Sequence, residues 1–232
     1  MLKTINKGVK MDFHNFLEKY NINDKMVGCY EWGSLLWKTM DEHSDLDFVV
    51  IIDSSKDIFE NYTFENIYNG NTFKTDIILL SNRTFEGLLW EHDEMAMALY
   101  FSSGLMNYNP SYFKLDLSKL RKSFSKKYNN SFVKAKKKYI VEYPKYHSEI
   151  ELRKSYKSLF HCIRILKFGI ALAKYKDDFE MDKFIYHLKD DYKMVKLIYE
   201  NNKEWEDIVA TFKKVFKYNE MASEFRRLAP KK

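Results

Sequence analysis

Two aspartates early in the chain have the type and spacing of a metal site. Asp45 and Asp47 lie two residues apart in Asp-Leu-Asp-Phe-Val-Val-Ile-Ile, a run rich in β-branched residues that predicts a strand over 45–52. Side chains alternate along a strand, so both carboxylates point to the same face. They repel each other unless a cation lies between them. Mg²⁺ is the usual hard cation for carboxylate oxygens and nucleotide phosphates.

A third carboxylate, Asp76, interrupts the apolar segment 74–80. An acid in such a segment needs a partner. If its strand neighbours the strand of Asp45 and Asp47, the three acids converge and can hold two Mg²⁺ ions. One ion would polarise an attacking hydroxyl and the other would hold a leaving triphosphate, with Asp76 as a ligand or a general base. A surface position at a strand end would explain Asp45 and Asp47 equally well, but not Asp76.

A short loop before these acids is suited to phosphate binding. Gly33 lets the backbone approach a ligand closely, and Ser34 and nearby backbone N–H groups can contact phosphate oxygens.

The elements that must position these residues follow from hydrophobic spacing and turn signals. Apolar residues at helical spacing predict a first helix over 8–20, and a short apolar run predicts a buried strand over 26–30. Segments 62–68 and 73–80 flank Asn69-Gly70, a strong hairpin signal. Ser81 or Asn82 can then cap a helix that runs to about Tyr100.

Everything after Pro110 reads as helical. We expect one basic amphipathic helix over 117–143 that Pro144 ends, then helices over 147–174, 192–200 and 205–227. The predicted fold class is therefore α+β, a small mixed sheet flanked by helices and followed by a helical domain. The boundary is expected near Asn107, giving a catalytic domain over 1–107 and a basic helical domain over 108–232.

The acidic motif resembles the DNA polymerase β-like nucleotidyltransferase superfamily. Its signature of an apolar residue, Gly, Gly or Ser, a spacer, Asp-apolar-Asp and a later acid is matched by Trp32-Gly33-Ser34, Asp45-Leu46-Asp47 and Asp76. The similarity covers about residues 26–80. Family members often carry Tyr-Gly after the Gly-Ser, whereas this chain has Trp37-Lys38, so Lys38 is a candidate phosphate contact or the loop differs in shape.

More faintly, the helical remainder resembles phage and bacterial nucleotidyltransferases associated with RNA repair. In that group a Lys-x-x-Tyr or similar run leads into a His-x-x-Arg helix, as 153–157 leads into 161–166 here. By this resemblance the helix borders the nucleotide site.

The same helix carries a polar stripe at spacings of 3, 4 and 3, formed by Lys154, Lys157, His161 and Arg164. Facing the acids, the stripe would neutralise a triphosphate, and Lys154 or Lys157 would hold the leaving pyrophosphate. A lysine-rich solvent face with a satisfied His161 is the alternative.

The net charge of +6 over 232 residues hides a division. Residues 111–176 hold 18 Lys+Arg against 4 Asp+Glu, a balance of +14, and the remainder of the chain carries −8. Helix 117–143 alone carries nine basic residues with aromatics interleaved, more than a small substrate requires. An RNA acceptor is therefore the favoured partner, although no standard RNA-binding motif is present.

Composition excludes several classes of protein. Two cysteines, Cys29 and Cys162, rule out a disulfide framework or a cysteine-rich zinc module. The first residues lack the apolar segment of a signal peptide, and the longest uncharged run, 95–113, is too polar to span a bilayer. We therefore expect a soluble cytoplasmic protein without a membrane partner.

These observations predict a Mg²⁺-dependent nucleotidyltransferase. It would move NMP from an NTP to a hydroxyl, most plausibly at an RNA or tRNA end, and release pyrophosphate. Alternatives are transfer to a small molecule, as in aminoglycoside-modifying enzymes, and nucleotidylation of a partner protein in a toxin–antitoxin pair. A nucleic-acid-binding module with a decayed site is a further alternative, which the three intact acids argue against.

Overall fold

The computed structural model describes residues 17–40, 44–68, 71–110, 113–146 and 148–230. The chain forms two compact units. A sheet unit comprises 1–90 and 95–113, and a helical unit comprises 91–94 and 114–232. The sequence predicts the domain boundary near Asn107. In the structure the last crossing from the sheet unit to the helical unit lies between Phe113 and Lys114. The predicted first helix, 8–20, lies mostly outside the described residues.

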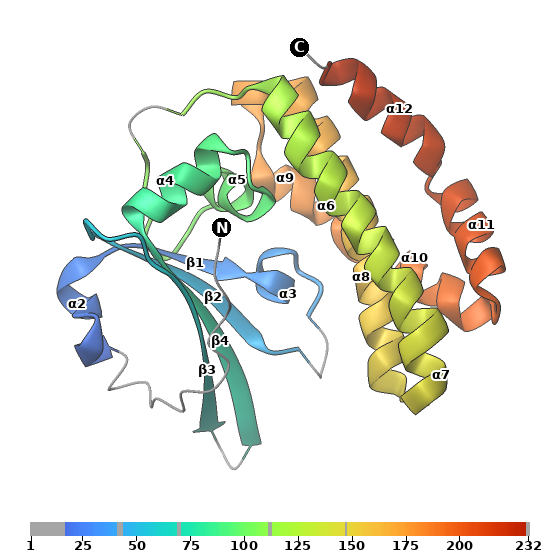
Figure 1. Cartoon of the computed structure of the whole chain (residues 1–232), viewed down its shortest axis with the longest axis horizontal. Coiled ribbons are helices and arrows are strands. Elements are labelled where there is room, and N and C mark those ends of the chain that lie inside the picture. Colours follow the sequence, from blue (N-terminus) through green and yellow to red (C-terminus); the bar gives the residue numbers. More distant parts are fainter. Residues whose placement is uncertain (1–16, 41–43, 69–70, 111–112, 147, 231–232) are drawn as a thin grey trace. The chain divides into compact units, whose positions relative to one another are not determined.

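The sheet unit is built on a four-stranded mixed sheet (Figure 1). Its strands are β1 (Met26–Trp32), β2 (Leu46–Ile52), β3 (Phe59–Tyr68) and β4 (Asn71–Ser81), in the spatial order β1-β2-β4-β3. β2 and β4 run parallel, and the two outer pairings are antiparallel. The α+β class, the small mixed sheet and the β3–β4 pairing are confirmed. The predicted turn at 69–70 lies outside the described residues.

Alternation along the strands gives the sheet two different faces. One buries Val50, Ile52, Phe64, Ile77 and Leu79 against Ile22 of α2 (Ile22–Lys25). We call the other the site face, because it carries Asp47 and Asp76.

On the site face the buried residues include Tyr30, Val49, Ile51 and Leu80. Among the helices that contact the strands, α3 (Gly33–Leu36) lies against β1 and β2, and α4 (Asn82–Trp90) lies against β2 and β4. Apolar burial therefore fixes the strands from both sides.

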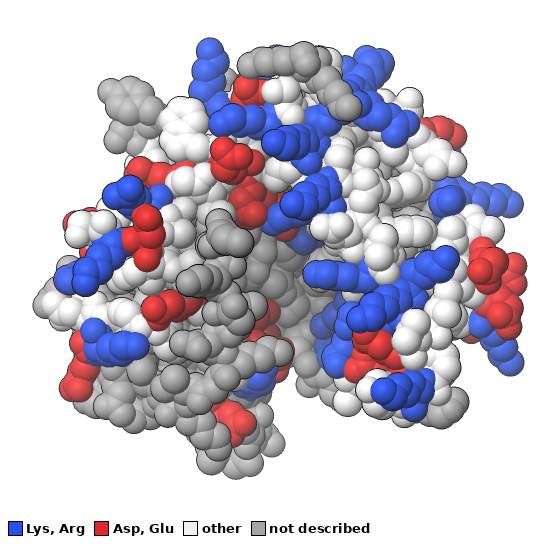
Figure 2. Space-filling view, in the orientation of Figure 1, with Lys and Arg blue, Asp and Glu red and all other residues white. Residues whose placement is uncertain are grey.

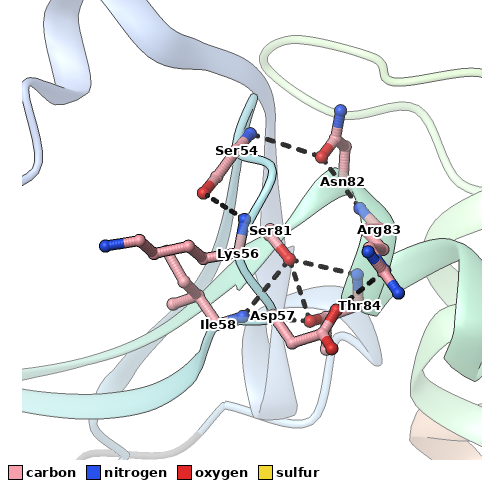
Figure 3. A network of polar contacts seen from close by, with 8 residues as sticks. All are labelled: Ser54, Lys56, Asp57, Ile58, Ser81, Asn82, Arg83 and Thr84. Atoms are coloured by element: carbon pink, nitrogen blue, oxygen red, sulfur yellow. Dashed lines mark hydrogen bonds and ion pairs between the residues drawn. The ribbon is translucent and has the colours of Figure 1, made fainter.

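A polar network joins the end of β4 to the start of α4 (Figure 3). The Ser81 hydroxyl accepts from the Thr84 N–H at 3.1 Å, which makes Ser81 the predicted N-cap of α4. The Ile58 N–H donates to Ser81 Oγ at 3.3 Å and to Thr84 Oγ1 at 3.1 Å. Asn82 Oδ1 accepts from Ser54 N at 3.3 Å. These bonds hold the β2–β3 connection against the helix start.

The single helix predicted from Ser81 or Asn82 to Tyr100 is wrong. The structure has α4 and then α5 (Glu94–Phe101), with a break in which His92 has φ +55°. A left-handed residue cannot continue a right-handed helix. His92 is buried, and its Nε2 accepts from the Asp116 N–H at 2.8 Å.

The helical unit is formed mainly by long helices that pack along one another. Its elements are α6 (Leu117–Lys137), a π-helical turn η1 (Lys138–Glu142), α7 (Tyr143–Tyr146), α8 (Glu149–Tyr175), a 3-10 turn η2 (Lys176–Asp178), α9 (Met181–Tyr186), α10 (Leu188–Asn201), α11 (Trp205–Val215) and α12 (Tyr218–Leu228). The rings of Phe124 and Phe168 lie 5.6 Å apart, and Ser155 Oγ donates to the Ala135 carbonyl at 2.8 Å. These contacts make α6 and α8 an antiparallel pair.

Two predicted helix boundaries in this unit need correction. Helix 117–143 does not end at Pro144, because it passes through η1 into α7, and Pro144 lies in the first turn of α7, where proline is tolerated. Helix 205–227 is two helices, because Lys217 takes a left-handed φ of +48° between α11 and α12. The helix predicted over 147–174 is α8, and the structure shows Ser148 as its N-cap. None of the helices in the described residues is long and apolar enough to cross a membrane.

Gly104 provides a test of the packing around β1. A Cβ at this position would lie 2.6 Å from the Cys29 carbonyl oxygen and 2.6 Å from the Tyr30 ring, whereas a Cβ at Gly87 in α4 would meet nothing within 4 Å. We predict that Gly104→Ala lowers the free energy of unfolding by about 1–3 kcal/mol through overpacking. Gly87→Ala should raise it by about 0.5–1 kcal/mol through helix propensity. Urea denaturation of both variants measures this, and equal effects would contradict the described packing.

Candidate functional site

The pairing of β2 with β4 places two acids side by side. Asp47 and Asp76 are register partners on these parallel strands, so their Cα atoms are separated by one strand spacing, about 4.8 Å, and their side chains share the site face. Asp45 comes two residues before Asp47 and takes the same side. The strand neighbourhood on which the three-acid prediction depended is thus present.

A lysine that the sequence analysis passed over lies among these acids. Lys74 Nζ lies 3.4 Å from Asp45 Oδ2 and 3.2 Å from Asp76 Oδ2. The side chains of Lys74 and Asp45 are each 44% exposed, and that of Asp76 is 35% exposed. On the neighbouring strand β3, the Thr63 hydroxyl donates to Asp76 Oδ1 at 2.6 Å. In the sequence, Lys74 could have been found from its position two residues before Asp76, which puts both side chains on the same strand face.

The ammonium of Lys74 responds to these partners. Burial lowers its pKa, but the hydrogen bond to Asp76 and the negative charges of Asp76 and Asp45 outweigh burial and leave the pKa raised above its usual value. Lys74 is therefore a full positive charge at neutral pH.

Gly33 lies directly against Asp47. Trp32, the last residue of β1, is the register partner of Asp47, and Gly33 follows it with φ +56°. A Cβ on Gly33 would lie 2.1 Å from Asp47 Oδ2. Both the left-handed φ and the close approach require glycine here. Ser34 is next along the chain, in the four-residue helix α3.

Lys38, the predicted phosphate contact after this loop, has a different partner. It takes φ +54°, and its ammonium lies 3.1 Å from Glu31 Oε2. Glu31 alternates with Trp32 along β1, so it belongs to the sheet face opposite Asp47. The side chain of Lys38 is 61% exposed, and its role toward a nucleotide stays a prediction.

The four residues of the predicted polar stripe lie in the helical unit and differ in environment. Lys154 is 50% exposed and pairs with Glu151 at 2.6 Å, and Lys157 is partly buried. Arg164 is 4% exposed, with its Nη1 2.8 Å from Glu94 Oε1. The three aspartates belong to the sheet unit, so contact between these four residues and a nucleotide held by the acids also stays a prediction.

His161 is a neutral side chain of this unit. Burial, together with the positive charges of Arg164, Lys157 and Lys134, lowers its pKa to about 3. Its Nδ1 is buried with no hydrogen-bond partner. His161 therefore carries no charge for a triphosphate at neutral pH.

Arg164 takes part in an ion-pair network around the start of α5. Burial lowers the pKa of its guanidinium, and the neighbouring Glu94 charge opposes that effect. Lys127 of α6 adds a pair to Asp93 at 2.8 Å and approaches Glu94 at 3.9 Å. Two buried opposite charges hold each other in place, so this pair joins α8 to the chain at 91–94.

The basic residues of α6 are mostly exposed, whereas its aromatic residues are not. Exposed lysines on this helix include Lys122, Lys126, Lys134, Lys136 and Lys137, and Figure 2 shows basic side chains over much of the visible surface of the helical unit. Phe124 and Tyr128 are buried, and the Phe132 ring lies 5.9 Å from the ring of Trp205. Phe124 and Tyr128 therefore belong to the core, which leaves the lysines as the surface feature.

The acids have the chemistry of a Mg²⁺ site without forming a closed cage. Within the described ranges, no three His, Cys, Asp or Glu side chains are grouped closely enough to hold a metal ion. Mg²⁺ usually binds one or two carboxylates and completes its shell with water and substrate phosphates. Asp47 and Asp76 offer such a pair on adjacent strands, and a positive charge already lies between Asp45 and Asp76. By donor type and placement these residues fit the ion.

Comparison with known proteins adds little to this geometry. No protein-family model and no curated protein sequence matches the chain. Among solved structures, the chain is similar to a nucleotidyltransferase-like protein from Exiguobacterium sibiricum 255-15 at 10% sequence identity. The alignment covers 91% of this chain and 76% of that chain, with a TM-score of 0.31. A score this low carries no weight for fold or function.

The burial of Arg164 against Glu94 leads to a prediction about the free energy of unfolding. Arg164→Met leaves the buried Glu94 carboxylate with only the Lys127 ammonium, 3.9 Å away, and we expect a loss of about 3–5 kcal/mol in the free energy of unfolding. Lys154→Met also replaces a positive side chain with methionine, but at an exposed position of the same helix, and should leave that free energy nearly unchanged. Chemical denaturation compares the two variants, and equal losses would show that the Arg164–Glu94 pair does not hold the unit together.

The buried His161 makes the free energy of unfolding depend on pH. The unfolded state takes up a proton near pH 6.5 and the folded state only near pH 3. The unfolded state therefore binds more protons between these values, and the free energy of unfolding falls as pH drops from 6.5, by up to about 1.4 kcal/mol per pH unit. Urea denaturation at pH 7, 6 and 5 should show a steeper loss for the wild type than for His161→Gln. Parallel curves would contradict the neutral buried state.

Proposed function

We propose that this protein is a Mg²⁺-dependent nucleotidyltransferase of the DNA polymerase β-like superfamily. It transfers NMP from an NTP to a hydroxyl and releases pyrophosphate. One observation carries the proposal: Asp47 and Asp76 are register partners on parallel strands, with the Gly33 backbone against Asp47. The sequence resemblance over 26–80 places its Gly-Ser, Asp-x-Asp and third acid on these same positions.

Asp45, Asp47 and Asp76 would hold the metal. When bound, Mg²⁺ offsets the charge of the triphosphate and makes the acceptor hydroxyl more acidic. The open arrangement of the acids suits an ion that arrives with its nucleotide, because phosphate oxygens then supply the remaining ligands.

The protein's own groups then orient the reactants. Gly33 would allow the backbone to lie close to a phosphate beside Asp47, and the Ser34 hydroxyl and N–H would donate to its oxygens. Asp76 ligates metal or accepts the proton of the acceptor hydroxyl. The Thr63 hydroxyl, at 2.6 Å from Asp76 Oδ1, fixes the orientation of that carboxylate.

The proposed acceptor is an RNA end, with a tRNA end as the first candidate. The support is the charge of the helical unit: residues 111–176 carry an excess of 14 positive charges, and many lysines of α6 are exposed. Cations arrayed along a helix neutralise a series of phosphates. Lys154 and Lys157 stay candidates for contacts to the leaving pyrophosphate, whereas Arg164 and His161 contribute to the interior of the unit.

The acids make a prediction about activity. With labelled NTP and Mg²⁺, we expect Asp47→Asn and Asp76→Asn each to reduce NMP transfer by at least about 100-fold, because each removes a negative ligand at the reacting phosphate. Asp57→Asn is the matched control: this carboxylate of the sheet unit is 70% exposed and pairs with Arg83, and its loss should leave transfer unchanged. Activity retained in the Asp47 variant would contradict the metal assignment.

The same assay separates the acceptors. Each of the four labelled NTPs is offered with total RNA, with protein extract and with a set of small hydroxyl compounds. Label in RNA that diminishes with added salt supports the proposed acceptor. Label only in protein, or only in a small molecule, would overturn the RNA proposal and leave nucleotidyl transfer standing.

A further inference from the structure

We propose that Lys74 is a positioning residue that acts as the resident counter-cation of the carboxylate site and competes there with the divalent ion. The inference rests on the proposed function, since it assigns a role within the same site. It predicts that the free protein binds Mg²⁺ weakly, and that a nucleotide strengthens binding.

The geometry leaves Asp76 with both oxygens engaged. Thr63 Oγ1 donates to Oδ1 at 2.6 Å, and Lys74 Nζ lies 3.2 Å from Oδ2. The same ammonium reaches Asp45 Oδ2 at 3.4 Å. A metal ion that used Asp76 Oδ2 together with Asp45 would occupy the position of Nζ, so one of the two cations has to leave.

The sheet explains why a cation is needed here in the absence of metal. The parallel register puts Asp47 beside Asp76, and Asp45 lies close enough to share the Lys74 ammonium with Asp76, so the carboxylates repel one another. Lys74 belongs to the same face two residues before Asp76, which puts one positive charge among them. It reduces their repulsion without any bound ligand.

Lys74 is also able to leave. Its side chain is 44% exposed and has a flexible four-carbon stem, so the ammonium can turn toward water. The negative phosphates of a nucleotide give it another partner of suitable charge. Metal and nucleotide therefore favour each other: the metal releases the ammonium from the carboxylates, and the nucleotide stabilises it after release.

The test is a Mn²⁺ titration, with free Mn²⁺ followed by electron paramagnetic resonance in the absence of nucleotide. We expect Lys74→Gln to tighten the Mn²⁺ Kd about tenfold at low salt, because one unit charge at contact distance has been removed near the surface. The gain should shrink as ionic strength rises. Lys74→Arg keeps the charge, and Lys56→Gln makes the same change in the β2–β3 connection, so both should bind as the wild type does.

A second measurement does not depend on activity. Lys74→Gln leaves the carboxylates without their counter-cation, so its metal-free Tm should fall, and saturating Mn²⁺ should raise its Tm by more than it raises that of the wild type. Addition of ATP should strengthen Mn²⁺ binding more in the wild type than in Lys74→Gln.

The outcomes separate this inference from the proposed function. If Asp47→Asn weakens Mn²⁺ binding while Lys74→Gln binds like the wild type, or more weakly, the metal site stands and the role of Lys74 is wrong. If Asp47→Asn binds Mn²⁺ as the wild type does, the ion is not at these carboxylates and both proposals fail. No binding by Lys74→Gln at millimolar Mn²⁺ would overturn the role of Lys74 alone, because the proposed function has the ion arrive with its nucleotide.

Discussion

The candidate site depends on the register between the parallel strands β2 and β4. That register places Asp47 beside Asp76, and apolar partners further along the same strands, such as Val50 with Leu79, hold it. A slip of one residue would turn the apolar side chains of one strand to the wrong face, so burial specifies the pairing strongly. The hydrophobic core thus forces together two like charges that would otherwise separate.

The surrounding groups offset that repulsion. The Thr63 hydroxyl and the Lys74 ammonium each engage one oxygen of Asp76, and Gly33 is the residue that fits against Asp47. The acids thus have partners without a ligand, and the side chain of Asp76 is still 35% exposed to receive one. This combination is what a metal-nucleotide site needs, because its negative charge is used only when substrate is bound.

The helical unit uses its positive charges in two ways. The lysines of α6 lie mostly at the surface, where they are available to a polyanion. Arg164 instead lies inside the unit against Glu94, and the neighbouring His161 is neutral. A stripe at helical spacing does not distinguish exposed from buried positive residues. α8 is more exposed at its start than further along, and only the neighbouring elements decide where burial begins.

Local signals predicted much of this structure. The β-branched strand after Asp45, the pairing of β3 with β4, the Ser81 cap and the shared face of Asp45 and Asp47 follow from strand alternation and turn chemistry. What the sequence could not supply depends on distant partners. His92, where the helix breaks, accepts a hydrogen bond from Asp116, and Arg164 is paired with a glutamate 70 residues earlier. The contacts of Lys74 with Asp45 and Asp76 could be identified only once the strand order was known.

The account is tested most directly by a crystal structure with Mn²⁺ and a non-hydrolysable NTP analogue, using the anomalous signal of manganese to locate the ion. We expect an anomalous peak at the carboxylates of Asp47 and Asp76, the triphosphate beside Gly33 and Ser34, and Lys74 turned away from Asp45. A structure at saturating Mn²⁺ in which Lys74 still bridges Asp45 and Asp76, with no peak at these acids, would contradict it.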